Sequence, residues 1–115
     1  MKKDIYLDVA QEIGSPSALT QEQGNIIFEE ISKSIRNQSI IHLDFGQIES
    51  MISPFLNNSI GKLYGEFTSE QIQNHLDLQH FPDEKKSTLN VVISNAKKYY
   101  ADKEKFNSAV KEVLH

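Results

Sequence analysis

The stretch that decides the fold is Ile40-Ile41-His42-Leu43-Asp44-Phe45, which reads as a buried strand ending in an acidic residue. Residues 46–52 then read as a turn, and the Ser53-Pro54 pair marks the start of a helix. This order predicts that Asp44, Ser53 and the free backbone N–H groups of a helix start lie at one edge of a sheet. Open α/β sheets carry their binding sites at that edge. The functional argument therefore concentrates on residues 40–57.

The N-terminal residues predict another strand. Residues 4–9 alternate polar and apolar side chains, which places Ile5, Leu7 and Val9 on one side. Such a pattern is typical of a strand with one buried face. Residues 14–17 read Gly-Ser-Pro-Ser and are expected to form a loop.

A helix is predicted between these two strands, because Thr20 followed by Gln23 matches a capping box and apolar residues recur at helical spacing as far as Arg36. Gly24 in its first turn favours close packing against a neighbouring element over contact with a ligand. The order strand, helix, strand predicts parallel pairing through a right-handed crossover. Because the strand at 40–45 is apolar on both faces except at His42, we expect it to be central and covered on both faces.

A second helix is expected from about Ser53 to Phe67. Ser53 is predicted to be its N-cap, and Pro54 fits the first helical position. Gly61 and Gly65 are four residues apart and therefore lie on one side of such a helix. We expect these glycines to allow close packing of the helix on the sheet.

The C-terminal part predicts one more strand and three helices. Thr68 and Gln71 repeat the capping-box pattern and predict a short helix, and residues 75–79 alternate like a strand. Pro82 marks the next helix start, and Asp102 is predicted to cap a last helix. That last helix is expected to bury Phe106, Val110, Val113 and Leu114. The whole pattern predicts a single α/β domain over residues 1–115, with about three strands in a mostly parallel or mixed sheet and four to five helices.

Composition excludes several classes of protein. The chain has 115 residues, of which 38% are hydrophobic and 24% charged, and this balance suits one compact domain. The net charge of −4 gives no general attraction to nucleic acid. The absence of cysteine excludes disulfides, thiolate catalysis and cysteine-based zinc sites. No apolar run approaches the ~20 residues that span a membrane. We therefore expect a cytoplasmic protein that binds neither nucleic acid nor membranes.

No catalytic or metal-binding constellation is recognisable in the sequence. The four histidines lack the i, i+4 spacing of a metalloprotease helix, and no Ser-His-Asp order or glycine-rich phosphate loop occurs. We expect no enzyme activity, no metal and no cofactor.

The candidate interaction or switch residues lie around the central turn, and they are Asp44, Ser50, Ser53, Asn57 and Asn58. Ser53 is either a plain N-cap or a phosphorylation switch, since a phosphate there would meet free N–H groups. Asp44 either hydrogen-bonds the backbone of the following turn or binds a cation or a basic group of a partner. Asn57 and Asn58 are either exposed polar positions or contacts for a partner or ligand.

These motifs resemble the STAS-like domain family of unknown function found in bacteria, which is related to the anti-sigma-factor antagonists. The resemblance covers most of the chain. It rests on Ala18-Leu19-Thr20 with Gly24, on Leu43-Asp44-Phe45, on Ile52-Ser53-Pro54-Phe55-Leu56-Asn57 and on Gly61-Lys62-Leu63-Tyr64. It implies a small sheet with helices packed against it and a regulatory, non-enzymatic role through protein contacts. The partner implied by the antagonists is a histidine-kinase-type ATPase.

The resemblance also bears on the serine switch. The antagonists carry Asp-Ser-Ser-Gly at the start of the corresponding helix, and the second serine takes the phosphate. Aligned through Asp44, the present chain has Pro54 at the phosphoacceptor position and Ile52 in place of the preceding aspartate. Ser53 is the neighbouring hydroxyl. The alternative to a protein-interaction module is a sensor that binds a nucleotide or another small anion near Ser53. Neither hypothesis predicts an oligomeric state.

Overall fold

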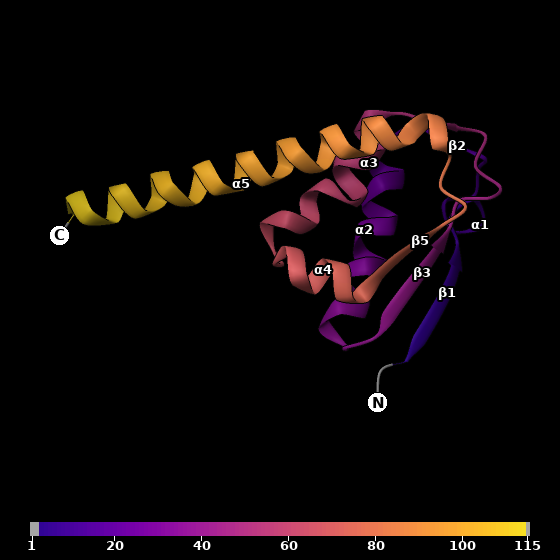
Figure 1. Cartoon of the computed structure of the whole chain (residues 1–115), viewed down its shortest axis with the longest axis horizontal. Helices are drawn as coiled ribbons and strands as arrows, with labels where there is room; N and C mark the ends of the chain where they lie inside the picture. Colours follow the sequence, from indigo (N-terminus) through magenta and orange to yellow (C-terminus); the bar gives the residue numbers. More distant parts are fainter. Residues whose placement is uncertain (1–2, 115) are drawn as a thin grey trace.

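The three predicted strands form one parallel sheet. The structure is a computed structural model that describes the backbone of residues 3–114 and the side chains of residues 3–101. Strands β1 (Asp4–Asp8), β3 (Ile40–Asp44) and β5 (Leu76–Gln79) lie side by side in the order β1-β3-β5, so that β3 is central. Both neighbouring pairs are parallel. The predicted α/β fold with a three-stranded, mostly parallel sheet is thereby confirmed (Figure 1).

A second, two-stranded sheet was not predicted. Strands β2 (Ser17–Ala18) and β4 (Ser50–Met51) pair in parallel. A long helix follows β2 in the chain, and a short helix follows β4. A short helix α1 (Val9–Ile13) was also missed. It is capped by the Asp8 carboxylate and ends at Gly14, whose φ of 72° is left-handed. These elements are too short to leave a periodic pattern in the sequence.

Helix α2 (Gln21–Arg36) forms as predicted. The Thr20 hydroxyl accepts the Gln23 N–H, and the Gln23 side chain accepts the Thr20 N–H, which completes the capping box. Gly24 packs against helix α3 (Ser53–Ser59). A Cβ at Gly24 would lie 2.7 Å from the Phe55 carbonyl oxygen, so the interpretation of Gly24 as a packing residue holds.

The long helix predicted from Ser53 to Phe67 is wrong. Helix α3 ends at Ser59, and the 3-10 helix η1 (Gly61–Gly65) follows it before α4 (Ser69–His75). Two glycines within five residues weaken the α-helix, and 3-10 turns commonly form at helix ends. The capping box of α4 at Thr68 and Gln71 is confirmed.

One continuous helix, α5 (Lys86–Leu114), replaces the two predicted C-terminal helices, and a 3-10 turn η2 (Asp83–Lys85) precedes it. Asp102 therefore lies inside a helix and does not cap one. Residues 86–114 contain no glycine or proline that would interrupt the helix. The predicted burial of Phe106, Val110, Val113 and Leu114 lies outside the described side chains. Figure 1 shows α5 extending well beyond the body of the protein.

The two glycines of η1 pack against α5, and the prediction that they pack on the sheet is wrong. A Cβ at Gly61 would lie 3.4 Å from a methyl group of Val92. A Cβ at Gly65 would overlap the ring of Tyr100. Small residues let two backbones approach closely. The glycines thus set the position of α5 on the body.

The helices that the structure describes cover the sheet on one face only. Ile41 and Leu43 of the central strand are fully buried, together with Ile27 and Ile31 of α2. In Figure 1, α2, α3 and α4 gather on the same side of the sheet. Successive side chains of a strand point to opposite faces, so His42 and Asp44 point away from this core. The expectation that the central strand is covered on both faces is therefore wrong.

Candidate functional site

The end of β3 holds Asp44 in a local network. Its Oδ1 atom accepts the N–H of Gly46 at 2.8 Å and lies 2.9 Å from Nδ1 of His80. The Gly46 N–H, and then His80, hold the pKa of Asp44 below its usual value. The turn contact predicted for Asp44 is present, whereas its histidine partner was not foreseen. His80 follows the neighbouring strand β5, and no sequence pattern links the two.

Ser50 and Ser53 lie on the other side of the turn. Ser50 is an exposed residue of β4, which pairs with β2 and not with the main sheet. Ser53 is exposed and is the first residue of α3. The N-cap position belongs to Ile52, and no side chain caps this helix. The prediction that Ser53 is the N-cap is therefore wrong by one residue. Pro54 follows Ser53 and lies in the first turn of the helix.

Two apolar side chains are exposed beside these serines. Ile52 and Leu19 each keep 42% of their surface accessible. They are neighbours in space, because Leu19 follows Ala18 and Ile52 follows Met51, and Ala18 and Met51 are paired. The Ile52 N–H also donates to the carbonyl oxygen of Ala18. We call Leu19, Ser50, Ile52 and Ser53 the junction surface. A turn that only had to be soluble would not need two aliphatic side chains here.

Asn57 and Asn58 both lie about one turn further along α3 than Ser53. The Asn58 side chain donates to the carbonyl oxygen of Gln21, so it helps to join α3 to α2. Both asparagines also line a shallow cavity of about 290 Å³ between α3, η1 and α5. Its other polar lining residues are Lys62, Asn95, Tyr99 and Tyr100. The described residues of its lining thus supply amide, hydroxyl and ammonium groups and no carboxylate.

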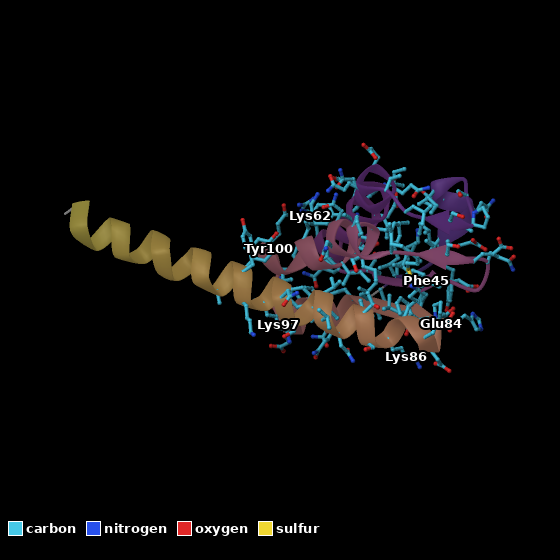
Figure 2. The ribbon with its side chains drawn as sticks, turned by 90° about the horizontal axis from the view of Figure 1, so that it is seen from above. Phe45, Lys62, Glu84, Lys86, Lys97 and Tyr100 are labelled. Carbon is cyan, nitrogen blue, oxygen red and sulfur yellow. The ribbon has the colours of Figure 1, made fainter. Side chains whose placement is uncertain are left out.

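Two residues of α2 contact the side chain of Lys62 and hold it in place. Its Nζ atom lies 2.6 Å from Oδ1 of Asn25 and 4.4 Å from the centre of the Phe28 ring. Burial raises the pKa of the Tyr100 hydroxyl, so this side chain stays a neutral donor. Lys62 and Tyr100 lie on the same side of the molecule, where α5 leaves the body (Figure 2).

The uncovered side of the sheet carries a second group of polar residues, which sequence reasoning missed. We call it the open face and define it by Asp4, Tyr6, Asp8, His42, Asp44 and Asp77. The alternation of each strand and the register Tyr6–His42–Asp77 place these side chains together. Each strand does carry polar residues at alternate positions, which could have been noticed in the sequence. A single strand, however, does not show that the polar residues of all three strands share one face.

His42 joins all three strands of the sheet at the open face. Its Nε2 atom lies 2.9 Å from Asp4 Oδ1, and its Nδ1 atom lies 2.8 Å from Asp77 Oδ2. A neutral imidazole has one N–H and could satisfy only one carboxylate, whereas imidazolium satisfies both. Accordingly the contacts with Asp4 and then Asp77 raise the pKa of His42, and His42 lowers the pKa of Asp77. The Tyr6 ring stacks on His42, with the ring centres 4.5 Å apart.

A model of the STAS-like domains of unknown function matches residues 23–85, which is more than half of the chain. The chain belongs to this family. The matched part of the STAS-like domain runs from the first turn of α2 to η2, and it contains Asp44, both serines of the junction surface and both asparagines. Strand β1 and the whole of α5 lie outside the match. No curated protein and no solved structure shows significant similarity to the chain.

Within the described residues, no group of three or more histidine, aspartate or glutamate side chains is placed to hold a metal ion. None of the helices described here has both the length and the apolar character that crossing a bilayer requires. The junction surface presents an aliphatic pair with two hydroxyls, and the open face presents carboxylates around an imidazole.

Proposed function

We propose that the chain is a non-enzymatic regulatory module that docks a protein partner through the junction surface. The observation that carries this proposal is the exposed pair Leu19 and Ile52, which lies beside the exposed Ser50 and Ser53. Apolar side chains rimmed by polar ones are typical of protein-binding patches. Asp44 and Asn57 lie before and after this surface in the same strand-turn-helix unit.

The resemblance to anti-sigma-factor antagonists suggests a histidine-kinase-type ATPase as the partner. Family membership supports a regulatory role of this kind, because the matched region contains the strand-turn-helix unit in question. Regulation could act on Ser53, whose hydroxyl is exposed and is not engaged in capping α3. A phosphate at this position would add negative charge beside the aliphatic pair and oppose docking.

The test compares affinity capture by the wild-type chain with capture by an Ile52→Asp variant. Wild type is expected to retain an ATP-binding partner, identified by mass spectrometry, and the variant is expected to lose it, because a charge in an apolar contact is strongly unfavourable. Val91→Asp is the matched control, since Val91 is also an exposed aliphatic residue but lies on α5. Equal capture by wild type and Ile52→Asp would contradict the proposal. The same spectra show whether Ser50 or Ser53 carries phosphate.

A second candidate function is a sensor for a nucleotide or another small anion. The seven-residue helix α3 has a short dipole and no side-chain cap, so we place this alternative at the cavity beside Lys62 and not at Ser53. The described lining residues of that cavity offer donors and include no carboxylate, which suits an anion. Thermal-shift measurements with nucleotides and inorganic phosphate distinguish the two functions. A rise in melting temperature that disappears in Lys62→Met would favour the sensor, because ligands stabilise the state that they bind.

A further inference from the structure

The open face lacks a layer that most parallel sheets have. Parallel sheets are normally covered on both faces, because helices in the crossover connections pack on each side. In the present fold the side chains of Ile41 and Leu43 face the helices, while His42 and its neighbours face outward. Tyr6, on the edge strand β1 of this outer face, is 71% exposed, the highest value among the large apolar residues of the described side chains.

The open face is acidic. The residues of β1, β3 and β5 include Asp4, Asp8, Asp44 and Asp77 but no lysine or arginine. The carboxylates remain accessible although they contact histidines. The Asp4 side chain is 53% exposed, that of Asp77 is 48% exposed, and that of Asp44 is 40% exposed. Each carboxylate has two oxygens, and His42 occupies one oxygen of Asp4 and one of Asp77.

Tyr6 adds a flat surface next to these carboxylates. One side of its ring stacks on His42, with 12° between the two ring planes, and its high exposure leaves the other side accessible. A guanidinium group stacks well on a tyrosine ring and at the same time donates to carboxylates through its planar fork. Tyr6 and Asp4, which lie two residues apart on β1, therefore offer one arginine both of the contacts that it prefers.

We propose that the open face docks an arginine-bearing basic segment of a protein partner, with one guanidinium stacked on Tyr6 and paired with Asp4, and a second basic side chain paired with Asp77. This surface is distinct from the junction surface, and the inference does not depend on the function proposed above. Docking needs no rearrangement of the sheet, because His42 already holds the two carboxylates on either side of its ring.

Charge disfavours the other occupants. A second copy of the chain that stacked its own open face here would bring four aspartates against four aspartates. Pairing of two β1 edges with Tyr6 opposite Tyr6 would place Asp4 directly across from Asp8 of the other copy, and like charges in such pairs are destabilising. Nucleic acid carries the same sign of charge as the open face.

The test is an NMR titration of the full chain with three synthetic peptides of equal length, in which alanines alternate with arginine, lysine or glutamate. The arginine peptide is expected to shift the backbone signals of β1, β3 and β5. The lysine peptide should bind more weakly because it lacks the planar stacking group, and the glutamate peptide should not bind. Shifts that map to another part of the chain, or equal shifts with the glutamate peptide, would overturn the proposal.

Two variants separate the contacts. The double variant Asp4→Asn with Asp77→Asn is expected to weaken binding of the arginine peptide about tenfold, since two exposed ion pairs are lost. Its control is Glu22→Gln with Glu29→Gln, which removes the same charge from the exposed side of α2 and should leave binding nearly unchanged. An equal loss in the control would show general charge attraction and refute a docking site.

Tyr6→Ala keeps both carboxylates and tests the stacking contact. It is expected to weaken the arginine peptide more than the lysine peptide and thereby to reduce the preference between them. An unchanged preference would exclude stacking on Tyr6. Sedimentation of the free chain completes the test, because it shows whether the chain forms a dimer. If a dimer forms and the NMR signals that change on dimerisation belong to β1, β3 and β5, the open face binds a second copy instead.

Discussion

At the scale of single residues, the helix starts at Thr20 and Ser53 differ in how their free N–H groups are satisfied. Thr20 accepts the Gln23 N–H within a complete capping box, whereas Ser53 caps nothing. Thr20→Ala is therefore expected to lower the free energy of unfolding by about 1 kcal/mol, the usual contribution of a cap. Ser53→Ala should change it by less than about 0.5 kcal/mol. Urea denaturation followed by circular dichroism measures both, and equal losses would contradict this assignment of the caps.

His42 makes stability depend on pH in a definite direction. Its contacts with Asp4 and Asp77 raise its pKa in the folded state, while its pKa in the unfolded state is about 6.5. The stabilisation is thus complete below that pH and is lost as the pH rises through the folded pKa. For Asp77 the folded pKa is lowered, so its stabilisation is complete above about pH 4 and is lost as the pH falls.

The measurement is the difference in free energy of unfolding between wild type and Asp77→Asn across the pH range. We expect the difference to be largest between about pH 4 and pH 6.5 and to shrink at alkaline pH. Asp83→Asn provides the control, because the partner of Asp83 is Lys86, which stays charged throughout this range. A difference for Asp77→Asn that stayed constant up to pH 9 would show that His42 is not the titrating partner.

At the scale of elements, the position of α5 depends on its contact with the glycines of η1. Val92 is 4% exposed and faces Gly61, whereas its neighbour Val91 is 57% exposed. Val92→Ala is expected to lower the free energy of unfolding by about 1–3 kcal/mol through lost burial and the cavity left behind. Val91→Ala, the same change one residue earlier, should lie within about 0.5 kcal/mol of wild type. Denaturation curves that rank the two variants the other way would contradict this docking of α5.

The elements differ in how far the sequence could predict them. Patterns that depend on local geometry predicted their elements. These patterns are the capping boxes at Thr20 and Thr68 and the alternation of polar and apolar side chains in residues 4–8 and 76–79, and the corresponding helices and strands are present. The end of α3 at Ser59 and the continuity of α5 depend on each other, because α5 packs at Gly61 where α3 gives way to η1. Such packing between distant segments leaves no local pattern. The two-residue strands β2 and β4 were missed because they are too short to show alternation.

The candidate site shows the same limit. Asp44, Ser50 and Ser53 could be chosen from their place between a strand and a helix, and the structure puts both serines at an exposed junction. Leu19 joins them only because β2 pairs with β4, and His80 reaches Asp44 only because β5 lies beside β3. The open face was assigned to the core because the central strand reads as apolar on both sides. Its polar character becomes visible only when three strands are placed in register.

At the scale of the whole molecule, the two proposed surfaces differ in what holds a partner, and salt should separate them. Contacts at the open face are between accessible charges, which are largely screened beyond about 10 Å at 0.1 M salt and about 3 Å at 1 M. The junction surface relies on burial of Leu19 and Ile52, which salt does not screen. Raising sodium chloride from about 0.05 M to about 0.5 M is therefore expected to weaken the arginine peptide strongly and to leave capture by the junction surface nearly intact.

The salt series also tests whether the surfaces act independently. Substitutions at Asp4 and Asp77 should remove the salt dependence of peptide binding without changing capture through Ile52, because the open face and the junction surface share no residue. Ile52→Asp should do the reverse. Isothermal titration for the peptide and quantified capture for the partner give the two readouts. If Asp4→Asn with Asp77→Asn lowered capture as much as Ile52→Asp did, one partner would span both surfaces, and the chain would have a single extended interface.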